Sequence, residues 1–441
     1  MADVLLGADL GTSGLKVVAL ATDGTVVAEA ERAYDVDRPA PDRAETDVRV
    51  WRAAFDDAVG EVADRLRGAV IAASGISGQM HGAVLVDGGG VALRPAILWP
   101  DRRAAGELAR WRELPEADRA ALANPLVAGM TGPVLAWLAR HEPEAVGRAA
   151  TVLLPKDALR TALGGRAGTD RSDASATLLW DVLADGWSAG AVAAAGVPGD
   201  LLPAVRPSDE VAGTVRLPGG EVPVVVGGAD TPLALLAAGA EGLLVNLGTG
   251  AQVLAPLGEP RPAAEPVVHT YADAAGGWYA MAALQNAGSA WEWARGVLGL
   301  SWTEFFDAAA SSPSGAGGAT FAPFLTGERG GVAGPDDRGG WTGLHPGTTR
   351  ADLARAAVEG VARAVAGSTA LLDAPEGPVV VTGGGARPAV VRQALADALG
   401  RPVRHLRLRS ASAIGAAVLA GRGTGLDVEP RRDAGPPVEP A

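Results

Sequence analysis

The chain has 441 residues, 48% of them hydrophobic and 20% charged, an ordinary globular mixture that predicts two or three domains. Its formal net charge of −13 argues against nucleic acid or an anionic membrane as a partner, because both would repel it. The sequence contains no cysteine, which excludes disulfides, thiolate metal sites and a cysteine nucleophile.

Nothing in the sequence indicates targeting to a membrane. The segment Met1–Gly11 lacks the basic region of a signal peptide. The apolar stretch Leu233–Ala240 stops at Glu241, far short of the about 20 residues that a membrane-spanning helix needs. We therefore expect a cytoplasmic protein.

The first half opens with a strand, a turn and a second strand. Apolar residues 4–8 and 17–20 flank the turn Gly11-Thr12-Ser13-Gly14. A helix capped by Asp47 should follow, because apolar residues recur there at spacings of three and four: Trp51, Phe55, Val59, Val62 and Leu66. Residues 70–76 then predict a buried strand, and residues 83–86 and 91–98 predict a hairpin.

The rest of the chain predicts alternating strands and helices. Residues 104–205 are rich in alanine and mostly helical in pattern, and a domain boundary is expected near Pro223. The second half opens again with strand, turn and strand around Gly248-Thr249-Gly250. A helix, a strand, a glycine turn, a helix, a strand and a last helix follow, at 350–372, 379–382, 383–387, 388 onward, 403–408 and 414–420. This order is typical of an α/β protein.

One short motif occurs in both halves. Asp9-Leu10-Gly11-Thr12 recurs as Asn246-Leu247-Gly248-Thr249, each time at the tip of an apolar hairpin. The repeat suggests two domains of one topology that face each other across a cleft.

The two turns are candidate phosphate sites. Glycine lets backbone N–H groups approach an anion closely, and Thr12 and Ser13 add hydroxyl donors. Asp9 could hold Mg²⁺, since hard cations prefer oxygen ligands. An ordinary hairpin turn explains either motif alone, but a pair on opposing domains could hold the β- and γ-phosphates of a nucleotide from both sides.

A third glycine loop, Gly383-Gly384-Gly385-Ala386-Arg387, lies between a predicted strand and a predicted helix. That arrangement suits nucleotide contact, because the backbone can approach closely and N–H groups point outward. It lacks the lysine of a P-loop, and a tight strand-to-helix turn is the alternative.

Two further motifs follow predicted strands. Gln79-Met80-His81-Gly82 offers hydrogen bonds for sugar hydroxyls beside an adaptable apolar wall, although a structural role for His81 is the alternative. Gly227-Gly228-Ala229-Asp230 places a carboxylate where α/β proteins bind ligands. Asp230 could accept the proton of an attacking hydroxyl, or it could cap a helix that begins at Thr231-Pro232.

Together these segments resemble the FGGY carbohydrate kinases, and within them the xylulokinases, in one shared order over residues 4–420. The motifs that carry the resemblance are Asp9-Leu10-Gly11-Thr12-Ser13-Gly14, Gly78-Gln79-Met80-His81-Gly82, Arg94-Pro95-Ala96-Ile97-Leu98-Trp99, His141-Glu142-Pro143-Glu144, Leu153-Leu154-Pro155-Lys156-Asp157, Ser172-Asp173-Ala174, Gly227-Gly228-Ala229-Asp230, Leu247-Gly248-Thr249, Gly327-Glu328-Arg329, Gly383-Gly384-Gly385-Ala386-Arg387 and Ile414-Gly415-Ala416-Ala417.

The resemblance implies an α/β fold of two actin-like, ribonuclease H-like domains with an interdomain cleft. It implies a sugar-binding domain at residues 1–222 and an ATP-binding domain at 223–425. The Pro- and Gly-rich composition after Arg422 predicts a flexible tail at 426–441. The implied reaction is ATP- and Mg²⁺-dependent phosphorylation of the terminal hydroxyl of D-xylulose. A kinase for ribulose, arabitol, xylitol or glycerol, or a non-catalytic sugar- or nucleotide-binding relative, is the alternative, and a homodimer is a further expectation.

The resemblance also implies roles for individual residues. Asp230 is the expected base, and Asp9 the expected catalytic acid near the metal. The expected sugar contacts are Gln79, Met80, His81, Trp99, Asp101, Asp230 and Thr231. The expected nucleotide contacts are Gly11, Thr12, Ser13, Gly248, Thr249, Gly384, Gly385 and Arg387.

This chain departs from the family pattern at four places. Thr231 stands where Asn or Gln is usual, Pro100 where Asn is usual and Val134 where Lys is usual. Gly330-Gly331 replaces a Thr-Pro pair. Thr231 and Pro100 lie beside expected sugar contacts, so they bear on the substrate more than on the reaction.

Overall fold

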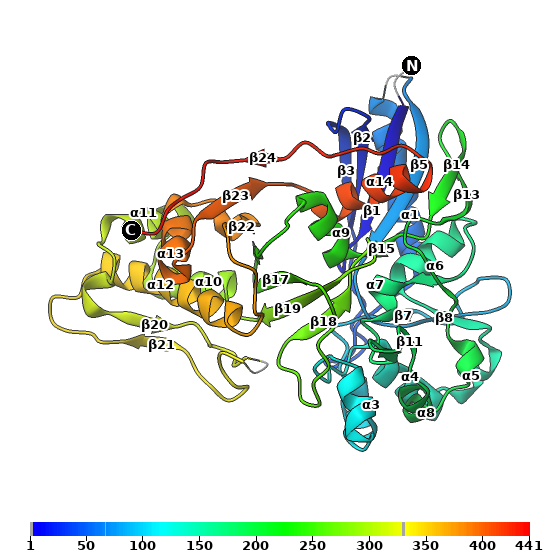
Figure 1. Cartoon of the computed structure of the whole chain (residues 1–441), viewed down its shortest axis with the longest axis horizontal. Coiled ribbons are helices and arrows are strands. Elements are labelled where there is room, and N and C mark those ends of the chain that lie inside the picture. Colours follow the sequence, from blue (N-terminus) through cyan, green and yellow to red (C-terminus); the bar gives the residue numbers. More distant parts are fainter. Residues whose placement is uncertain (1–2, 67, 329–330) are drawn as a thin grey trace.

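The computed structural model describes residues 3–66, 68–328 and 331–441. These residues form two halves that lie side by side, each built on a mixed sheet (Figure 1). The sheet of the first half has the strand order β13-β14-β5-β1-β2-β3, with β15 beside β5. Its strands are β1 (Asp3–Leu10), β2 (Gly14–Ala21), β3 (Val26–Ala33), β5 (Val70–Gly78), β13 (Val211–Leu217), β14 (Gly220–Val225) and β15 (Gly228–Ala229).

The sheet of the second half has the order β18-β19-β17-β16-β22-β23-β24. Its strands are β16 (Leu244–Leu247), β17 (Ala251–Leu257), β18 (His269–Ala272), β19 (Trp278–Leu284), β22 (Val379–Thr382), β23 (Val403–Arg407) and β24 (Asp433–Ala434). In each half an antiparallel hairpin continues into parallel strands: β1 pairs with β2 and β5, and β16 pairs with β17 and β22. The expectation of two domains with one topology is therefore confirmed.

Helix α1 (Val48–Arg65) forms as the sequence predicts. The Asp47 side chain accepts a hydrogen bond from the Arg49 N–H and caps the helix. Four residues of the predicted stripe, Trp51, Phe55, Val59 and Val62, are buried.

The last helix, α14 (Ala411–Gly423), returns to the first half and packs on β1 and β5 next to α9 (Asp230–Ala238) (Figure 1). Two glycines of the first sheet permit this close approach. A Cβ atom at Gly7 would lie 1.8 Å from the carbonyl oxygen of Ala413, and one at Gly75 would lie 2.1 Å from that of Ala416. The C-terminal part of the chain thus completes the N-terminal half.

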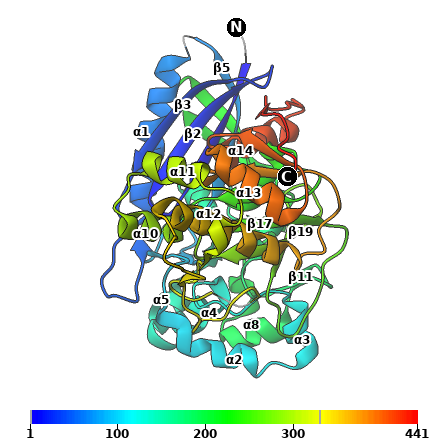
Figure 2. The ribbon, with the colours of Figure 1, turned by 90° about the vertical axis from the view of Figure 1, so that its left-hand side faces the viewer.

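Helices gather at the end of the first half that is remote from the N-terminus, and others cover the second sheet (Figure 2). The middle of the chain is mostly helical, as predicted, with α2 (Leu108–Arg112), α3 (Glu116–Ala121), α4 (Thr131–His141), α5 (Pro143–Arg148), α6 (Pro155–Ala162), α7 (Arg171–Ala174) and α8 (Ala189–Ala195). The second half adds α10 (Gly288–Leu298), α11 (Trp302–Ser311), α12 (Arg350–Thr369) and α13 (Ala389–Leu399). Short strands pair outside the two main sheets: β4 (Glu45–Thr46), β6 (Val84–Val86), β7 (Ala96–Ile97), β8 (Thr151–Leu153), β9 (Thr169–Asp170), β10 (Trp180–Asp181), β11 (Gly186–Trp187), β12 (Val205–Arg206), β20 (Thr320–Ala322) and β21 (Gly340–Thr342).

The predicted hairpin at residues 83–98 is only partly correct. The chain does reverse at Asp87, but its arms meet only at the bridges Ala83–Ile97 and Val86–Ala92. Strand β6 instead pairs with β8, and β7 pairs with β4. Partners from distant parts of the chain take the backbone groups that a simple hairpin would have paired.

The boundary expected near Pro223 falls inside β14, which pairs with β5 of the first sheet. A division between α9 and β16 fits the two sheets better, and we propose it in place of residue 223. The flexibility of residues 426–441 stays a prediction. In the structure this segment crosses from the first half to the second (Figure 1). The Arg431 N–H donates to the Gly24 carbonyl of the first half, and Val438 pairs with Val403 of the second half.

Candidate active site

A cavity of about 550 Å³ lies between the two halves. Many of the predicted site residues line it: Thr12, Gln79, Met80, His81, Trp99, Asp230 and Thr231 from the first half, and Gly248 and Thr249 from the second. They come from the ends of β1 and β5, the segment after β7, the start of α9 and the β16–β17 turn. The fold therefore gathers residues that are up to 237 positions apart in the sequence around one space.

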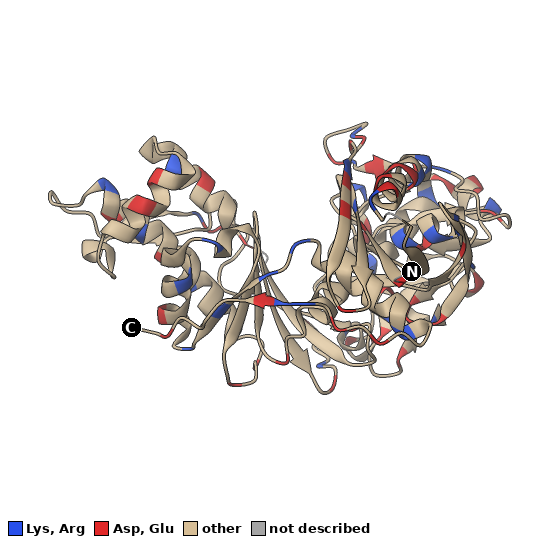
Figure 3. Cartoon of the chain, turned by 90° about the horizontal axis from the view of Figure 1, so that it is seen from above, with Lys and Arg blue, Asp and Glu red and all other residues tan. Residues whose placement is uncertain are grey.

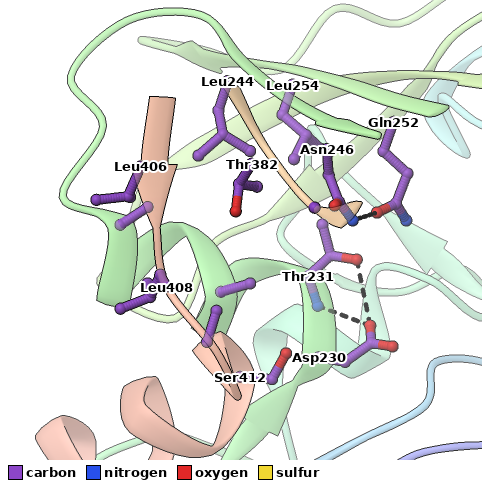
Figure 4. A pocket seen from close by; sticks show the side chains of 14 residues that line it. Asp230, Thr231, Leu244, Asn246, Gln252, Leu254, Thr382, Leu406, Leu408 and Ser412 are labelled. Carbon is purple, nitrogen blue, oxygen red and sulfur yellow. Dashed lines mark hydrogen bonds between the residues drawn. The ribbon is translucent and has the colours of Figure 1, made fainter. Parts of the chain in front are cut away.

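Asp230 is the first residue of α9, and Ala229 is the N-cap. One carboxylate oxygen, Oδ1, accepts hydrogen bonds from the Thr231 N–H at 2.6 Å and from the Thr231 hydroxyl at 3.2 Å (Figure 4). Burial raises the pKa of Asp230 to about 7, and the negative charge of Asp9 contributes to this rise. The carboxylate thus retains one oxygen, Oδ2, that Thr231 does not engage.

Asp9 lies at the end of β1, close enough to Asp230 to affect its titration. Burial raises the pKa of Asp9 to about 6, while the positive charge of Lys16 opposes the rise. Its Oδ1 atom is buried without a hydrogen-bond partner. The two acids expected to converge do share one electrostatic environment.

The first glycine turn is held rigidly. The Gly11 N–H donates to the Gly14 carbonyl at 2.9 Å, and the Tyr34 hydroxyl donates to the Gly11 carbonyl at 2.5 Å. Thr12 accepts a hydrogen bond from the indole N–H of Trp99 at 2.8 Å. Ser13, at the tip, is exposed.

The second glycine turn lies against the start of α10. The Gly288 N–H donates to the Gly248 carbonyl at 3.1 Å, and the Ser289 N–H donates to the Thr249 carbonyl at 2.9 Å. A Cβ atom at Gly288 would lie 2.5 Å from the Gly248 carbonyl oxygen, so only glycine permits this contact. Both turns are thus fixed by contacts from other elements before any ligand binds.

His81 has an unusual backbone conformation, with φ at 68°. Such left-handed geometry is costly for a residue with a Cβ and tends to occur at functional sites. Its Nδ1 atom lies 2.6 Å from the Ala176 carbonyl oxygen, which makes Nδ1 the donor of the neutral ring and Nε2 the acceptor. Gln79 donates to the Gly11 carbonyl at 3.1 Å and so links the sugar-side segment to the first turn.

The third glycine loop borders the same region. A smaller cavity of about 220 Å³ is lined by Asp230 and Thr231 on one side and by Thr382 and Gly383 on the other (Figure 4). Gly383 has φ at 90°, and a Cβ there would lie 2.3 Å from the Leu247 carbonyl oxygen. Gly384 and Arg387 line a further cavity of about 680 Å³, whereas a Cβ on Gly385 would touch Leu247 and Trp291.

The structure does not bring Asp101 into the cavity of Asp230. Its Oδ2 accepts hydrogen bonds from the Ala44 N–H at 2.7 Å and from the Arg103 guanidinium at 2.8 Å, and its Oδ1 accepts one from the Arg103 backbone N–H at 2.9 Å. Only 1% of the residue is exposed. Because these partners occupy both carboxylate oxygens, the Asp101 side chain does not reach the cavity where the resemblance implies a sugar contact. Asp101 shapes the loop after Trp99.

Sequence reasoning missed several polar residues of the main cavity. Asn246 occupies in the second half the place of Asp9, and its side chain donates to Gln252 at 3.1 Å (Figure 4). Gln285 also lines the cavity, and its N–H donates to Glu328 at 2.8 Å. The sequence did contain one indication of this, because Asn246 occupies in the repeated motif the position that Asp9 occupies in the first copy. Arg329 and Gly330, two of the residues that carried expectations, lie outside the described residues.

The donor set near Asp9 suits a magnesium ion that also binds a nucleotide. Among the described residues, no group of three or more His, Cys, Asp or Glu side chains could hold a metal ion. The unpartnered oxygen of Asp9 fits a Mg²⁺ whose remaining ligands are phosphate oxygens and water.

Two domains of one topology, each presenting a glycine turn to a shared cavity lined by the carboxylate of Asp230, with Asp9 close enough to affect its pKa, define a sugar kinase of the actin-like class that uses ATP with Mg²⁺. The chain belongs to the FGGY family of carbohydrate kinases. The N-terminal domain of that family matches residues 4–237, and the C-terminal domain matches residues 243–424.

Several known proteins of similar sequence and structure are xylulose kinases. The chain is 35% identical to a xylulose kinase of Escherichia coli over 95% of its own length and 88% of the relative's. It is 36% identical to a xylulose kinase of Streptomyces rubiginosus over 96% of its own length and 89% of the relative's. The crystal structure of a "xyloylose kinase" from Brucella ovis superimposes with a TM-score of 0.92 at 32% identity and covers 99% of this chain and 95% of that one. Within the described part of the chain, no helix is long and apolar enough to cross a membrane.

Proposed function

We propose that the chain transfers the γ-phosphoryl group of ATP to the terminal hydroxyl of D-xylulose, giving xylulose 5-phosphate and ADP. The similarity to xylulose kinases supports the choice of sugar. The observation that carries the proposal is Asp230, a carboxylate of raised pKa in a cavity shared by both halves.

Asp230 acts as the base in this proposal. Its Oδ1 is held by Thr231, so Oδ2 accepts the proton of the sugar hydroxyl while the oxygen–phosphorus bond forms. A pKa of about 7 makes the carboxylate a better acceptor than an ordinary aspartate and keeps it ionised in part at neutral pH. Because the phosphoryl transition state is loose, orienting the hydroxyl matters as much as removing its proton.

The glycine turns hold the phosphates. Thr12 and Thr249 line the main cavity from opposite halves, Ser13 adjoins Thr12 at the exposed tip of the first turn, and Gly384 lies on the nucleoside side. Asp9 is the side chain that would hold Mg²⁺, which neutralises charge on the phosphate oxygens when it is bound.

The sugar lies on the side of the cavity formed by Gln79, Met80 and His81. His81 Nε2 accepts a hydrogen bond from a sugar hydroxyl, and the Trp99 ring forms a wall. The strained backbone of His81 fixes the direction of the imidazole before the sugar arrives.

The test is a coupled assay of ADP release with purified protein across pentuloses, hexuloses and polyols. We expect D-xylulose to have the highest kcat/KM. The Asp230→Ala variant should lose at least about 1,000-fold in kcat while still binding sugar in calorimetry. Turnover of no pentulose or polyol by folded protein would refute the proposal.

A second candidate is a kinase for another ketose or a polyol such as ribulose, arabitol, xylitol or glycerol. It is favoured by Thr231, which lines the cavity and donates its hydroxyl to Asp230 where the family usually offers an amide. The same panel decides, because a different sugar would then have the highest kcat/KM.

We also infer that the protein acts in the cytoplasm, where ATP and free sugar meet, and that it forms a homodimer. Size-exclusion chromatography with light scattering tests the second point, since a single species with the mass of one chain would exclude the dimer.

A further inference from the structure

Residues 428–441 run from the first half of the molecule to the second, and we call this segment the strap (Figure 1). Figure 3, viewed from above, shows a ribbon with adjoining basic and acidic segments that bridges the two halves. In the described part of the chain, the backbone crosses between the halves at two other places, residues 239–243 between α9 and β16 and residues 408–410 between β23 and α14. The strap is therefore a third connection.

Hydrogen bonds hold the beginning of the strap to the first half. The Arg431 N–H donates to the Gly24 carbonyl at 2.8 Å, and the Arg431 guanidinium donates to the Asp23 carboxylate at 2.7 Å. Next along the strap, Arg432 Nε donates to the Ala237 carbonyl of α9 at 2.9 Å. These partners belong to the β2–β3 turn and to α9, so the strap is attached to two separate elements of the first half.

The same part of the strap also packs closely. Val428 is only 3% exposed and lies in an apolar cluster with residues of β1, β2 and α14. A Cβ atom at Gly24 would lie 2.1 Å from the Glu429 carbonyl oxygen, so only glycine permits this approach. The Arg432 guanidinium covers Gly239, and its Cζ atom lies 2.4 Å from the position that a Cβ atom there would take. Such close fits are typical of a segment with a fixed place.

The remainder of the strap belongs to the second half. From Asp433 onward it lies along the edge of the second sheet, where β24 pairs with β23. Val438 and Val403 exchange two backbone hydrogen bonds at 2.8 Å and 2.9 Å. Gln393 of α13 donates its side-chain amide to the Glu439 carbonyl at 3.0 Å.

The strap has no spare length between its two attachments. Arg432 is bonded to the first half and Asp433 is paired in the second, yet they are neighbours, and consecutive Cα atoms are only about 3.8 Å apart. Arg432 covers Gly239, where one chain crossing begins, and Asp433 lies opposite Arg407, which precedes the other. Any rotation of the halves must therefore have its axis close to this peptide or detach one end of the strap.

We propose that the strap is a clamp across the hinge between the halves, with its pivot at the peptide between Arg432 and Asp433. Two single-chain crossings leave the halves free to twist as well as to close, whereas a third attachment without slack favours closure about one axis. The catalytic consequence rests on the proposed function. The glycine turns of opposite halves can hold the same phosphates only when they meet in register.

The first experiment measures the distance between the halves by double electron–electron resonance in the full chain without ligands. Spin labels at Asp64→Cys on α1 and Ala310→Cys on α11 suit it, because the chain has no other cysteine and both positions are exposed. The distribution of label distances should be at least about twofold wider in Arg432→Met/Val438→Pro than in the labelled chain without these substitutions.

The two substitutions release the two ends of the strap. The methionine removes the donor to Ala237, and the proline removes the N–H that Val438 donates to Val403. The control is Arg404→Met, which removes an exposed arginine of β23 beside the strap and should leave the distribution unchanged.

Hydrogen exchange of the unlabelled full chain separates the strap from a freely moving tail, which the composition of this segment predicts. In the wild type the amides of Arg431 and Val438 should exchange at least about 100-fold more slowly than in an unstructured peptide. Unprotected amides in the wild type, or equal widths of the distance distributions in the wild type and the double variant, overturn the inference.

The ADP-release assay tests the catalytic consequence. In the double variant kcat should fall at least about tenfold while the calorimetric affinity for sugar stays within about twofold, since the proposed sugar contacts lie on the first half. An unchanged kcat would overturn the role of the strap in phosphoryl transfer. Label distances and amide exchange need no turnover, so an inactive wild type would refute the proposed reaction without affecting the evidence for the clamp.

Discussion

At the scale of single residues, Asp230 of the main cavity and the neighbouring Asp9 should control the response to pH. Burial raises the pKa of Asp230 to about 7 and that of Asp9 to about 6. Both act as carboxylates in the proposed reaction, so activity needs the ionised forms. Protons should therefore inhibit the enzyme at unusually mild acidity for a pair of aspartates.

The first prediction concerns kcat/KM for the sugar between pH 5 and pH 9. It should be constant above about pH 8 and fall below pH 7, steepening below pH 6 where Asp9 also becomes protonated. Initial rates at saturating ATP measure it, with the coupling enzymes checked separately at each pH. A profile that stays flat down to pH 5 would contradict the assignment of Asp230 as the base.

The second prediction concerns Asp230→Asn. A carboxyl with a raised pKa binds its proton more tightly in the folded state, so its ionisation makes the fold less stable as the pH rises from about 4 to 7. The asparagine variant avoids that loss. The excess of its free energy of unfolding over that of the wild type should be roughly 1–3 kcal/mol larger at pH 8 than at pH 5, where only part of the loss has occurred.

Urea denaturation at the two pH values measures this difference. Asp64→Asn, at an exposed position on α1, is the control and should show no such change between the two pH values. If Asp230→Asn is equally or less stable than the wild type at pH 8, the carboxylate is not held in an unfavourable environment.

At the scale of elements, a buried charge network supports the start of α9. Lys156, the second residue of α6, is fully buried, and its Nζ atom lies 2.6 Å from Asp157, 3.1 Å from Asp170 and 3.2 Å from Asp173. The chain contains only one other lysine, Lys16. A buried cation with three carboxylates around it is costly to disturb, since each partner is already desolvated.

A short path links this network to the segment that carries the proposed base, Asp230. Asp170 accepts a hydrogen bond from the Ser172 hydroxyl at 2.6 Å, and Ser172 Oγ accepts one from the Ala229 N–H at 3.0 Å. Ala229 directly precedes Asp230. On the other side, a Cβ atom at Gly78 would lie 2.8 Å from Cβ of Lys156, so the network also lies directly beneath the segment that carries His81.

The third prediction is that Lys156→Met lowers the free energy of unfolding by about 3–5 kcal/mol, because uncompensated carboxylates stay buried. Lys16→Met, at the other lysine, should change stability by no more than about 0.5 kcal/mol, since that side chain is 42% exposed. Chemical denaturation monitored by tryptophan fluorescence measures both. Equal effects of the two substitutions would show that the network contributes no more than a surface ion pair.

At the scale of the whole molecule, the cavity between the halves implies domain closure. The glycine turns proposed to hold the phosphates come from opposite halves, and a kinase must exclude water to avoid hydrolysing ATP. The last segment touches both halves, through Gly24 and Val403, so it must follow any such motion.

The fourth prediction is that sugar and nucleotide together reduce the radius of gyration in small-angle scattering. The Asp230→Ala variant is a suitable sample, because it should bind both ligands without consuming them. Scattering profiles that coincide with and without ligands would exclude closure as part of the catalytic cycle.

Much of this protein could be predicted from local sequence patterns. Periodicity located β1, β2, β5 and α1, since the spacing of apolar residues reflects the face that each element buries. The repeated turn motif predicted two halves of one topology. The glycines and polar residues at strand ends identified most of the main cavity, because in α/β folds such ends are where ligands bind.

The tertiary structure alone decided contacts between segments far apart in the chain. In the tertiary structure β14 pairs with the first sheet, and α14 packs on the N-terminal half. Asp101 accepts hydrogen bonds from Ala44 and Arg103. The tertiary structure also buries Lys156 among three aspartates. Short-range patterns record which face of an element is apolar, but they do not record which distant group will meet a given charge. For that reason the sequence determined the kind of site, and the fold decided which charges surround it.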